Sequence, residues 1–483
     1  MTRGTTHRNL LRSTAVAILC VLGVRTAAGQ QSKNTRVDRI FAEWDRTDSP
    51  GCAVGAVRDN RFVYQRGYGM ANLDYDIPNS PAMVYYVGSD SKQFTAASIA
   101  LLSLQGKLSL DDDIRKFFPE MPDYGTPITV RHLIHHTSGI RDIYALMTLR
   151  GDRLEDVFSD SDAIALIARQ KGLAFKPGDQ YSYSNSGYFL LAQIVKRVSG
   201  TSLREYADAQ IFQPLGMVHT HFHDDPGHVM KNRAMSYERD ARGGYRISYL
   251  QNFDKIGAGG LYTTLDDLRK WDDNFYTHRV GGDALQKTIH TRGVLNGGDT
   301  LPYAFGNEIR LVRGLRTVEH GGALMGYKAY VLRFPEQHFS VLMTCNLGAI
   351  EPGPLAHAVA EVFLGDRMGP RAPSVPVASA PSQTGATTSP AFAAPTPEAA
   401  VFVGDYYSED LGIFYRVLRS EDGQMTIVPP RRSPIPLTPA DSGRFRAQGM
   451  TVRFERADAT SPASAMVIRF PRIGEMRLVR QSR

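Results

Sequence analysis

The chain has 483 residues, which is enough for a catalytic core and an additional domain. Hydrophobic residues make up 42% and charged residues 22%, as in an ordinary soluble globular protein. The formal net charge of +7 falls to about +3 without the four arginines of residues 1–29, and this charge excludes nucleic acid as an expected partner.

Residues 1–29 are typical of a secretory signal peptide. Three arginines precede the apolar run STAVAILCVLGV, and the small-residue stretch TAAGQ follows it. The apolar run is too short to span a bilayer as a stable helix. Leu19 stands where a lipoprotein signal would need a small residue before Cys20, so we interpret the segment as a plain export signal. We therefore expect a periplasmic or extracellular protein with no stable membrane span in the mature chain.

Residues 30–368 are expected to form an α+β domain. An amphipathic helix opens it, because apolar residues recur at helical spacing from Val37 to Trp44 before Pro50 and Gly51 end the pattern. The strands CAVGAVRD and RFVYQRGYG follow and should pair as a hairpin around an Asp-Asn turn.

The rest of this domain is predicted as a helical middle followed by strands. Helices are expected at 89–105, 186–199, 202–212, 264–276 and 354–365, and strands at 303–311, 316–322, 328–336 and 339–346. Strands at both ends of a long helical middle predict an antiparallel sheet flanked by helices.

The first candidate for chemistry is the stretch YVGSDSKQFTA. Ser89 and Lys92 are three residues apart at the start of a predicted buried helix, so their side chains should share one face. A lysine whose pKa is lowered by burial can remove the proton of a serine hydroxyl. The pattern also fits an N-capping serine beside a solvated lysine, but no other Ser-x-x-Lys occurs in the chain. We interpret Asp90 and Ser91 as spacers.

A second candidate is Tyr-Ser-Asn in FKPGDQYSYSNSGYFLLAQIV. Tyr183 and Asn185 are two residues apart before a predicted helix, so in an extended segment a phenol and an amide would face one cleft. Alone, the pattern favours a tyrosine beside a helix-capping polar run, but no other Tyr-x-Asn occurs in the chain.

The run VHTHFHDD offers a metal hypothesis. His219, His221, His223 and Asp225 include the H-x-H-x-D pattern of some zinc hydrolases. Alternating histidines can also form one exposed face of a strand, and we favour this solvated or structural interpretation. His132, His135 and His136 are likewise interpreted as packed residues, so no metal site is predicted.

A third candidate is the segment VEHGGALMGYKAYVLRF. His320 is followed by Gly321 and Gly322 on a predicted strand, and the missing side chains would let a substrate backbone lie against the strand edge.

Residues 369–398 are predicted to be a linker, because Pro, Ala, Ser and Thr dominate and large apolar residues are almost absent. Residues 399–483 contain about eight short alternating runs, which indicate a small all-β barrel or sandwich.

Two cysteines, Cys52 and Cys345, remain after removal of the signal peptide. A disulfide can form in an oxidising compartment, and two buried thiols in neighbouring strands are an equal alternative.

In their order, the three candidate motifs resemble the active-site elements of the serine β-lactamase and penicillin-binding-protein superfamily. The resemblance is strongest to its class C-like branch, which includes D-aminopeptidases, DD-carboxypeptidases and carboxylesterases. HLIHHTSGIRD, IFQPLGM and GAGGLYTTLDDLRKW also resemble stretches of that branch, and the similarity covers about residues 35–366. It implies a β-lactamase/transpeptidase-like fold with a helical subdomain. The C-terminal region resembles the lipocalin-like barrels appended to some members, and we expect it to shape or cover the cleft.

The resemblance also implies roles for the candidate residues. Ser89 would be the nucleophile, Lys92 its activating partner, Tyr183 the proton shuttle and Asn185 the group that orients Lys92 and the substrate amide. The oxyanion hole would comprise the backbone N–H groups of Ser89 and Ala323, on the strand that carries Gly321 and Gly322.

His320 departs from the Lys-Thr-Gly usual in β-lactamases and carboxypeptidases. It is expected to have a pKa of about 6.5 and to be largely neutral at pH 7, whereas the family's lysine is a fixed charge that helps to hold the substrate carboxylate. This favours a peptide, amide or ester hydrolase over an efficient β-lactamase. We expect a small-molecule or peptide substrate, with peptidoglycan-derived peptides among the candidates, and no cofactor. The alternatives are a non-catalytic penicillin- or cell-wall-peptide-binding protein and, less favoured, a zinc-dependent hydrolase.

Overall fold

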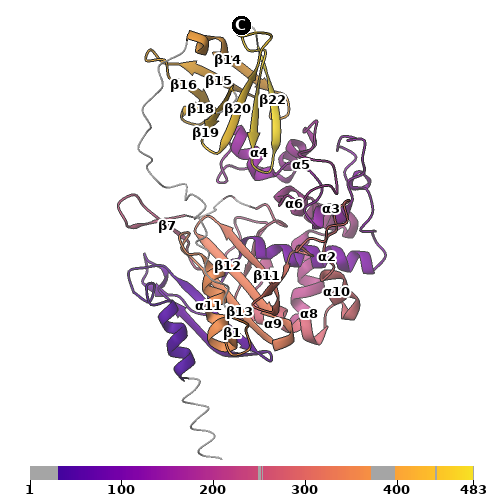
Figure 1. The fold of residues 1–483 in the computed structure, drawn as a ribbon. Helices are drawn as coiled ribbons and strands as arrows, with labels where there is room; N and C mark the ends of the chain where they lie inside the picture. Colours follow the sequence, from indigo (N-terminus) through magenta and orange to yellow (C-terminus); the bar gives the residue numbers. More distant parts are fainter. Residues whose placement is uncertain (1–30, 249–251, 253, 371–396, 441–442, 482–483) are drawn as a thin grey trace, which may run out of the picture.

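The computed structural model describes residues 31–248, 252, 254–370, 397–440 and 443–481. The expected signal peptide and most of the expected linker lie outside these described residues. Figure 1 shows a larger part, in which helices surround a sheet, and a separate C-terminal sheet beside the helices α4 and α5.

The larger part is built on a six-stranded antiparallel sheet with the strand order β10-β11-β12-β13-β1-β2. The predicted hairpin is formed by β1 (Cys52–Arg58) and β2 (Arg61–Tyr68). The other strands are β10 (Glu308–Val312), β11 (Leu315–Leu324), β12 (Tyr327–Phe334) and β13 (Phe339–Cys345). Because β13 pairs with β1, strands from both ends of the region belong to one sheet, as the sequence predicted.

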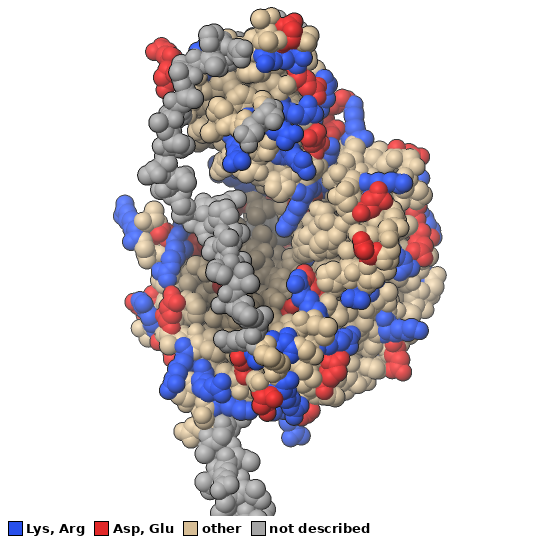
Figure 2. All heavy atoms as spheres, in the orientation of Figure 1, with Lys and Arg blue, Asp and Glu red and all other residues tan. Residues whose placement is uncertain are grey.

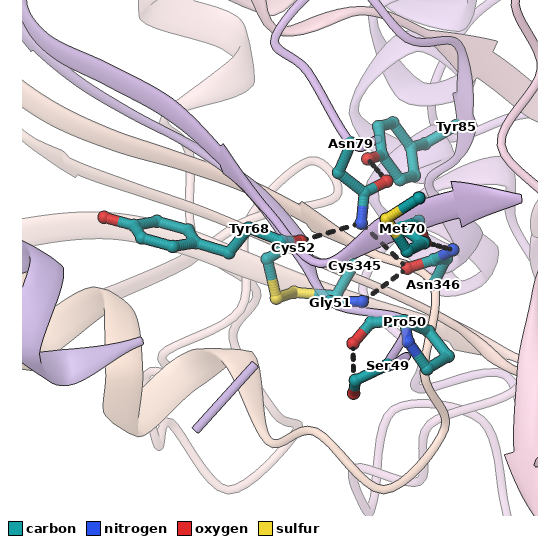
Figure 3. Close-up of a disulfide and its surroundings, with 10 residues drawn as sticks. All are labelled: Ser49, Pro50, Gly51, Cys52, Tyr68, Met70, Asn79, Tyr85, Cys345 and Asn346. Atoms are coloured by element: carbon teal, nitrogen blue, oxygen red, sulfur yellow. Dashed lines mark hydrogen bonds between the residues drawn. A yellow bond between two sulfur atoms is a disulfide. The ribbon is translucent and has the colours of Figure 1, made fainter. Parts of the chain in front are cut away.

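Cys52 and Cys345 face each other across β1 and β13 and form a disulfide. Both residues are fully buried. Beside them the Asn346 side chain accepts a hydrogen bond from the Gly51 N–H at 2.9 Å and donates one to the Met70 carbonyl at 2.9 Å, as Figure 3 shows. Of the two arrangements that the sequence left open, the structure therefore has the covalent one, which joins positions 293 residues apart.

Alternate residues of the central strands face two different hydrophobic layers. Val54 and Met343 pack with residues of α11 (Pro352–Leu364), whereas Ala53 and Leu342 face the layer that contains α9 (Leu265–Thr277). This follows from the period of two in a β-strand. The helix over residues 31–40 lies on the α11 side, where Phe41 stacks on Tyr68.

The helical middle is organised around α2 (Lys92–Leu104), whose residues from Lys92 to Leu102 are all buried. This confirms the predicted buried helix. The other helices are α3 (Val130–Ile134), α4 (Ile143–Arg150), α5 (Asp160–Ala168), α6 (Asn185–Ser199), α7 (Leu203–Ala207), α8 (Gln213–Leu215) and α10 (Gly282–Ile289). Short strand pairs are β3 (Met70–Asn72) with β4 (Ile77–Pro78), β9 (Leu261–Thr263) with both β5 (Tyr85–Tyr86) and β6 (His221–Phe222), and β7 (Tyr237–Arg239) with β8 (Tyr245–Ile247).

The predicted helix 202–212 is interrupted. After α7 the backbone widens to a π-helical turn over Asp208–Phe212, and the Gln213 N–H bonds to the Asp208 carbonyl. Pro214 explains the change, because proline lacks an N–H and its ring clashes with the carbonyl four residues earlier in an α-helix.

The C-terminal residues form a nine-stranded antiparallel sheet with the order β17-β16-β15-β14-β22-β21-β20-β19-β18. The strands are β14 (Gly404–Ser408), β15 (Ile413–Arg419), β16 (Met425–Val428), β17 (Ile435–Pro436), β18 (Thr438–Ala440), β19 (Arg444–Ala447), β20 (Met450–Glu455), β21 (Ala465–Phe470) and β22 (Gly474–Arg480). Only Leu437 separates the two edge strands β17 and β18 in the chain, so the sheet must curl until its edges nearly meet. The result is the predicted barrel in a nearly closed form.

This barrel is docked on the helical middle through buried polar contacts. The Tyr415 hydroxyl donates to the Leu149 carbonyl at 2.6 Å, and Arg141 forms a buried ion pair with Asp410 at 2.6 Å. Both residues of that ion pair are largely shielded from water, so direct contacts, and not only the linker, hold the barrel against the helices.

Candidate active site

Ser89 and Lys92 lie at the N-terminal end of α2. Ser89 belongs to a 3₁₀ turn, η1 (Gly88–Ser91), which leads directly into the helix at Lys92. The Lys92 Nζ is 3.0 Å from the Ser89 Oγ. Ser89 is partly exposed, whereas Lys92 is fully buried, so the hydroxyl faces the cavity and the amine supports it from within.

The surroundings of Lys92 favour its neutral form. Its pKa is lowered to about 7, mainly by burial; the charge of Asp142 opposes this shift, and that of Arg472 adds to it. The Nζ also donates to the Ala258 carbonyl at 2.6 Å and to the Asn185 Oδ1 at 3.1 Å. A neutral amine has only two N–H donors, so with these two bonds made its lone pair is free to accept the proton of Ser89.

Asp142 holds Asn185 in the orientation that Lys92 requires. One carboxylate oxygen caps α4 by accepting from the backbone N–H groups of Tyr144 and Ala145, both at 3.1 Å. The other accepts from the Asn185 backbone N–H at 2.6 Å and from its side-chain Nδ2 at 2.9 Å. The amide nitrogen therefore points to Asp142, and its oxygen points to Lys92.

Tyr183 completes the group around the serine. Its hydroxyl is hydrogen-bonded to the Ser89 side chain, and its ring lies 4.8 Å from the Lys92 Nζ. Burial raises the pKa of this phenol, so it stays protonated at neutral pH and can donate a proton. Lys92 thus contacts the three other predicted side chains, Ser89, Tyr183 and Asn185, and Tyr183 also contacts Ser89.

The glycines on both sides of the serine bring two backbone segments together. A Cβ on Gly322 would lie 1.8 Å from the Val87 carbonyl oxygen and 2.9 Å from the Ser89 nitrogen, and a Cβ on Gly88 would lie 2.5 Å from the Ala323 nitrogen. The backbone N–H groups of Ser89 and Ala323 are therefore neighbours, as an oxyanion hole requires.

The variant Gly322→Ala is expected to lower kcat by about 10²- to 10³-fold, the range for loss of one oxyanion donor. The added methyl group would overlap the Val87 carbonyl and push β11 away from Ser89. Steady-state kinetics of the purified variant measure the loss, with Gly314→Ala as the matched control. Gly314 has open space around its Cβ position but a φ of +85°, so its substitution costs local strain without touching the site. Equal losses in both variants would contradict the interpretation.

His320 lies on β11, the predicted strand, but it differs from the expected titration. It does not line the cavity, and its ring is buried between the Tyr303 hydroxyl, 3.1 Å from Nε2, and the Gly321 carbonyl, 2.8 Å from Nδ1. Burial and the nearby charge of Lys92 lower its pKa to about 3. The expectation of titration near pH ~6.5 is therefore wrong, because the ring is desolvated, and His320 is a neutral group behind the site.

Asp90 and Ser91 are also more than spacers. Asp90 is fully buried 3.7 Å from His320, and burial raises its pKa well above the ordinary value. The Ser91 hydroxyl donates to the Gly88 carbonyl and accepts from the Leu261 N–H, so it fixes the turn that carries Ser89.

A cavity of about 750 Å³ opens in front of Ser89. Its walls include Gly321, Gly322 and Ala323 of β11. Arg472 of the C-terminal barrel also lines it, and Figure 2 shows a recess below the barrel with basic side chains at its border. The sequence motifs did not reveal Arg472, Asp142 or the Ala258 carbonyl. Asp142 alone had a local signal, since it precedes a helix in TSGIRD as an N-cap does.

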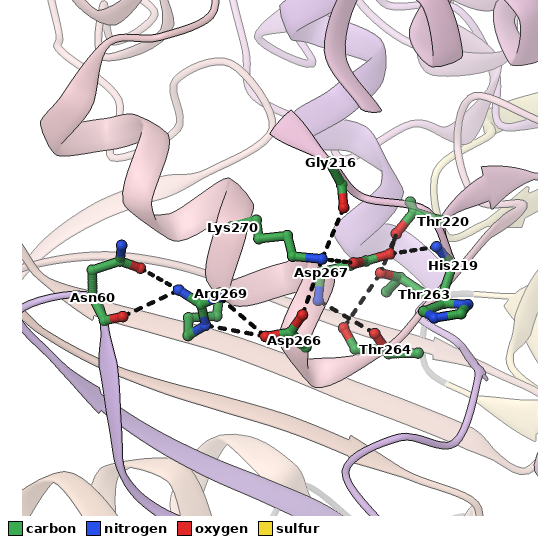
Figure 4. A network of polar contacts seen from close by, with 10 residues as sticks. All are labelled: Asn60, Gly216, His219, Thr220, Thr263, Thr264, Asp266, Asp267, Arg269 and Lys270. Carbon is green, nitrogen blue, oxygen red and sulfur yellow. Dashed lines mark hydrogen bonds and ion pairs between the residues drawn. The ribbon is translucent and has the colours of Figure 1, made fainter. Parts of the chain in front are cut away.

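The histidine run does not line the cavity, and it is less exposed than expected. The His219 backbone N–H donates to the buried Asp267 carboxylate, which Figure 4 shows at the start of α9. His221 and His223 pack on Tyr262, and His223 is buried. Among the described residues, no group of three or more His, Cys, Asp or Glu side chains is arranged to hold a metal ion.

Comparison with known proteins gives a consistent set of similarities. A sequence model of the Beta-lactamase family matches residues 37–362. The chain is 31% identical over 302 residues to a D-aminopeptidase of Gluconobacter oxydans (strain 621H), an alignment that covers 62% of this chain and 56% of that protein. The chain therefore matches little more than half the length of that relative.

Two solved structures have a similar fold. One is the octameric penicillin-binding protein homologue from Pyrococcus abyssi, with a TM-score of 0.62 and 24% identity over 93% of this chain and 99% of the other. The second is the D-amino acid amidase from Ochrobactrum anthropi SV3 complexed with L-phenylalanine amide, with a TM-score of 0.57 and 20% identity over 70% of this chain and 99% of the other. At these identities the likeness concerns the fold alone.

Proposed function

The chain belongs to the Beta-lactamase family, and on that premise we propose that it is a serine hydrolase that forms an acyl-enzyme on Ser89. The observation that carries the proposal is the 3.0 Å contact between Ser89 and a fully buried Lys92 whose pKa is lowered to about 7. A serine hydroxyl needs such a base within hydrogen-bond reach to become a nucleophile.

In the proposed acylation, neutral Lys92 takes the hydroxyl proton as the Ser89 Oγ bonds to the substrate carbonyl carbon. The carbonyl electron pair becomes an oxyanion, which the N–H groups of Ser89 and Ala323 stabilise. When the intermediate collapses, the leaving group departs with the proton of the Tyr183 hydroxyl, and the Lys92 ammonium returns a proton to Tyr183.

Deacylation repeats these steps with water as the nucleophile. Lys92 takes a proton from the attacking water. When the bond to the acyl carbon breaks, the Ser89 oxygen leaves with the proton of the Tyr183 hydroxyl, and the Lys92 ammonium returns a proton to Tyr183. Asn185, held by Asp142, keeps the Lys92 amine directed at the serine through both halves of the reaction. No metal or organic cofactor takes part in the proposed mechanism.

We propose amides or esters of D-amino acids and D-peptides as the substrate class, with peptidoglycan-derived peptides among the candidates. The D-aminopeptidase of Gluconobacter oxydans supports this class. The neutral, buried His320 cannot supply the fixed charge that a lysine provides in efficient β-lactamases, so we rank β-lactams below amides and esters.

We also propose that the protein is exported, on the basis of residues 1–29. The disulfide between Cys52 and Cys345 supports an oxidising compartment. No helix among the described residues has the length and apolarity needed to cross a membrane.

A hydrolysis panel tests the activity and its substrate class. It contains nitrocefin, D-alanyl amides with their L-alanyl counterparts, and short-chain p-nitrophenyl esters. We expect turnover of D-alanyl amides or esters, with nitrocefin slower, and loss of every activity in Ser89→Ala.

Two outcomes of the panel would support the alternatives. Stoichiometric acylation without turnover of any substrate would support the non-catalytic binding protein. Hydrolysis that a chelator abolishes, while a fluorophosphonate has no effect, would support the zinc-dependent hydrolase.

A further inference from the structure

One turn of the C-terminal barrel reaches the catalytic cavity. It joins β21 to β22 and carries Arg472, whose φ of +62° places it at the tip of a tight turn. The Arg472 carbonyl accepts a hydrogen bond at 3.1 Å from the backbone N–H of Asp142, the residue that orients Asn185. The turn is therefore hydrogen-bonded to the residue that holds Asn185 in place beside Lys92.

Arg141 fixes the same turn on its other side. Its guanidinium donates to the Ile473 carbonyl at 3.2 Å and to the Glu475 carbonyl at 2.9 Å. Arg141 is buried and also pairs with Asp410 at 2.6 Å. These contacts fix the backbone on both sides of Arg472, so the docking of the barrel determines the position of Arg472 in the cavity wall.

The Arg472 guanidinium carries a charge that no carboxylate neutralises within the described parts of the chain. It lies 5.2 Å from the centre of the Tyr183 ring and lines the cavity. Arg453 and Arg477 of the same barrel, by contrast, both pair with Glu455. An arginine that is positioned but unpaired in a cavity wall is suited to bind an anionic group, because its fork of N–H donors matches a carboxylate.

Two other polar side chains of the cavity already have acidic partners. Lys328 lies 3.6 Å from Glu351, and His357 lies 3.1 Å from Glu319. His320, on the strand where the family usually has a cationic lysine, is buried and outside the cavity wall. Among the described residues Arg472 is thus the unpaired cation best placed to meet a substrate anion.

We propose that Arg472 binds a carboxylate on the leaving group of the substrate and makes the enzyme selective for esters and peptides that end in a free carboxylate. This inference rests on the proposed acylation of Ser89. Arg472 lies beside Tyr183, the proposed proton donor to the leaving group, so its guanidinium is on the leaving-group side of the cleft.

The test uses two esters that differ only in this carboxylate. They are N-acetyl-D-alanyl-D-lactate and N-acetyl-D-alanyl-D-lactamide, and the full chain is assayed for kcat/KM on both. We expect the wild type to prefer the lactate ester by at least about 10-fold. We expect Arg472→Ala to lower kcat/KM for the lactate ester by about 10- to 100-fold, which corresponds to the loss of one or two charge-assisted hydrogen bonds. The fold-decrease in kcat/KM for the lactamide ester should be at least about tenfold smaller.

Two variants serve as controls. Arg472→Lys should restore part of the preference, because it keeps the charge without the fork of donors. Arg469→Ala removes an exposed arginine from β21 of the same barrel that does not line the cavity, and its preference should equal that of the wild type. A structural role for Arg472 would instead lower the rates on both esters equally, and this result would overturn the inference.

Other outcomes separate the inference from the proposed function. A preference for N-succinyl-D-alanyl-D-lactamide that disappears in Arg472→Ala would place the bound carboxylate on the acyl side and overturn the leaving-group assignment. If a fluorophosphonate labels Ser89 but neither lactate nor lactamide ester is hydrolysed, the inference fails while the proposed nucleophile stands. If Ser89 is not labelled and no ester is hydrolysed, both fail.

Discussion

Replacing Ser89 by alanine is expected to lower kcat by at least about 10⁴-fold on every substrate that the wild type hydrolyses, because the residue that forms the covalent bond is removed. The loss should be concentrated in kcat, since the cavity wall and the backbone N–H groups of Ser89 and Ala323 remain. The folded state should be nearly unchanged, because the Ser89 side chain is partly exposed and Lys92 keeps its bonds to Asn185 and Ala258.

Intact-protein mass spectrometry after exposure to a fluorophosphonate checks the same residue without a known substrate. The wild type should gain the mass of one adduct, and peptide mapping should place it on Ser89. The matched control is Ser103→Ala, on the same helix α2 but at its far end, which should label like the wild type. An adduct that persists in Ser89→Ala would identify another nucleophile and refute the proposed mechanism.

The local parts of the site could be predicted because short spacings determine them. Ser89 and Lys92 share a face because they stand three residues apart at a helix start, and Tyr183 stands two residues before Asn185, which begins α6. The hairpin β1–β2 and the buried helix α2 were predictable for the same reason, since apolar periodicity and turn residues are local signals.

The parts of the site that depend on distant contacts could not be predicted. Asp142 acts on Asn185 across 43 positions in the chain, and the Ala258 carbonyl reaches Lys92 across 166. Arg472 reaches the cavity only because a separate barrel docks there, and no spacing in the sequence encodes that docking.

The burial and pairing of individual side chains also could not be predicted from the sequence. His320 was expected to titrate near neutrality, but its desolvated ring between Tyr303 and Gly321 has a much lower pKa. The pairing of Cys52 with Cys345 depends on the register of β1 and β13, which residue patterns alone left open.

Lys92 is expected to control the pH dependence of the reaction. Its neutral form is the base, and burial lowers its pKa to about 7, so kcat/KM should rise with pH and level off above a midpoint near pH 7. Removing the negative charge of Asp142, which raises this pKa, should move the midpoint to lower pH. Asp142→Asn therefore tests the assignment by the direction of the shift, although its overall rate should fall because Asn185 loses its acceptor.

Two substitutions of Lys92 separate the roles of base and fixed charge. Lys92→Ala removes both and should lower kcat/KM by at least about 10³-fold. Lys92→Arg keeps a positive charge near Ser89, but a guanidinium does not lose its proton in proteins. If Lys92 acts as the base, the arginine variant should be as impaired as the alanine variant, and the rise of kcat/KM around pH 7 should disappear in both.

The measurement is the pH profile of kcat/KM, together with the rate of fluorophosphonate labelling of Ser89, with Lys107→Ala as the exposed lysine control. Substantial activity in Lys92→Arg with a flat pH profile would instead assign Lys92 a purely electrostatic role, because the charge alone would then suffice to activate the serine.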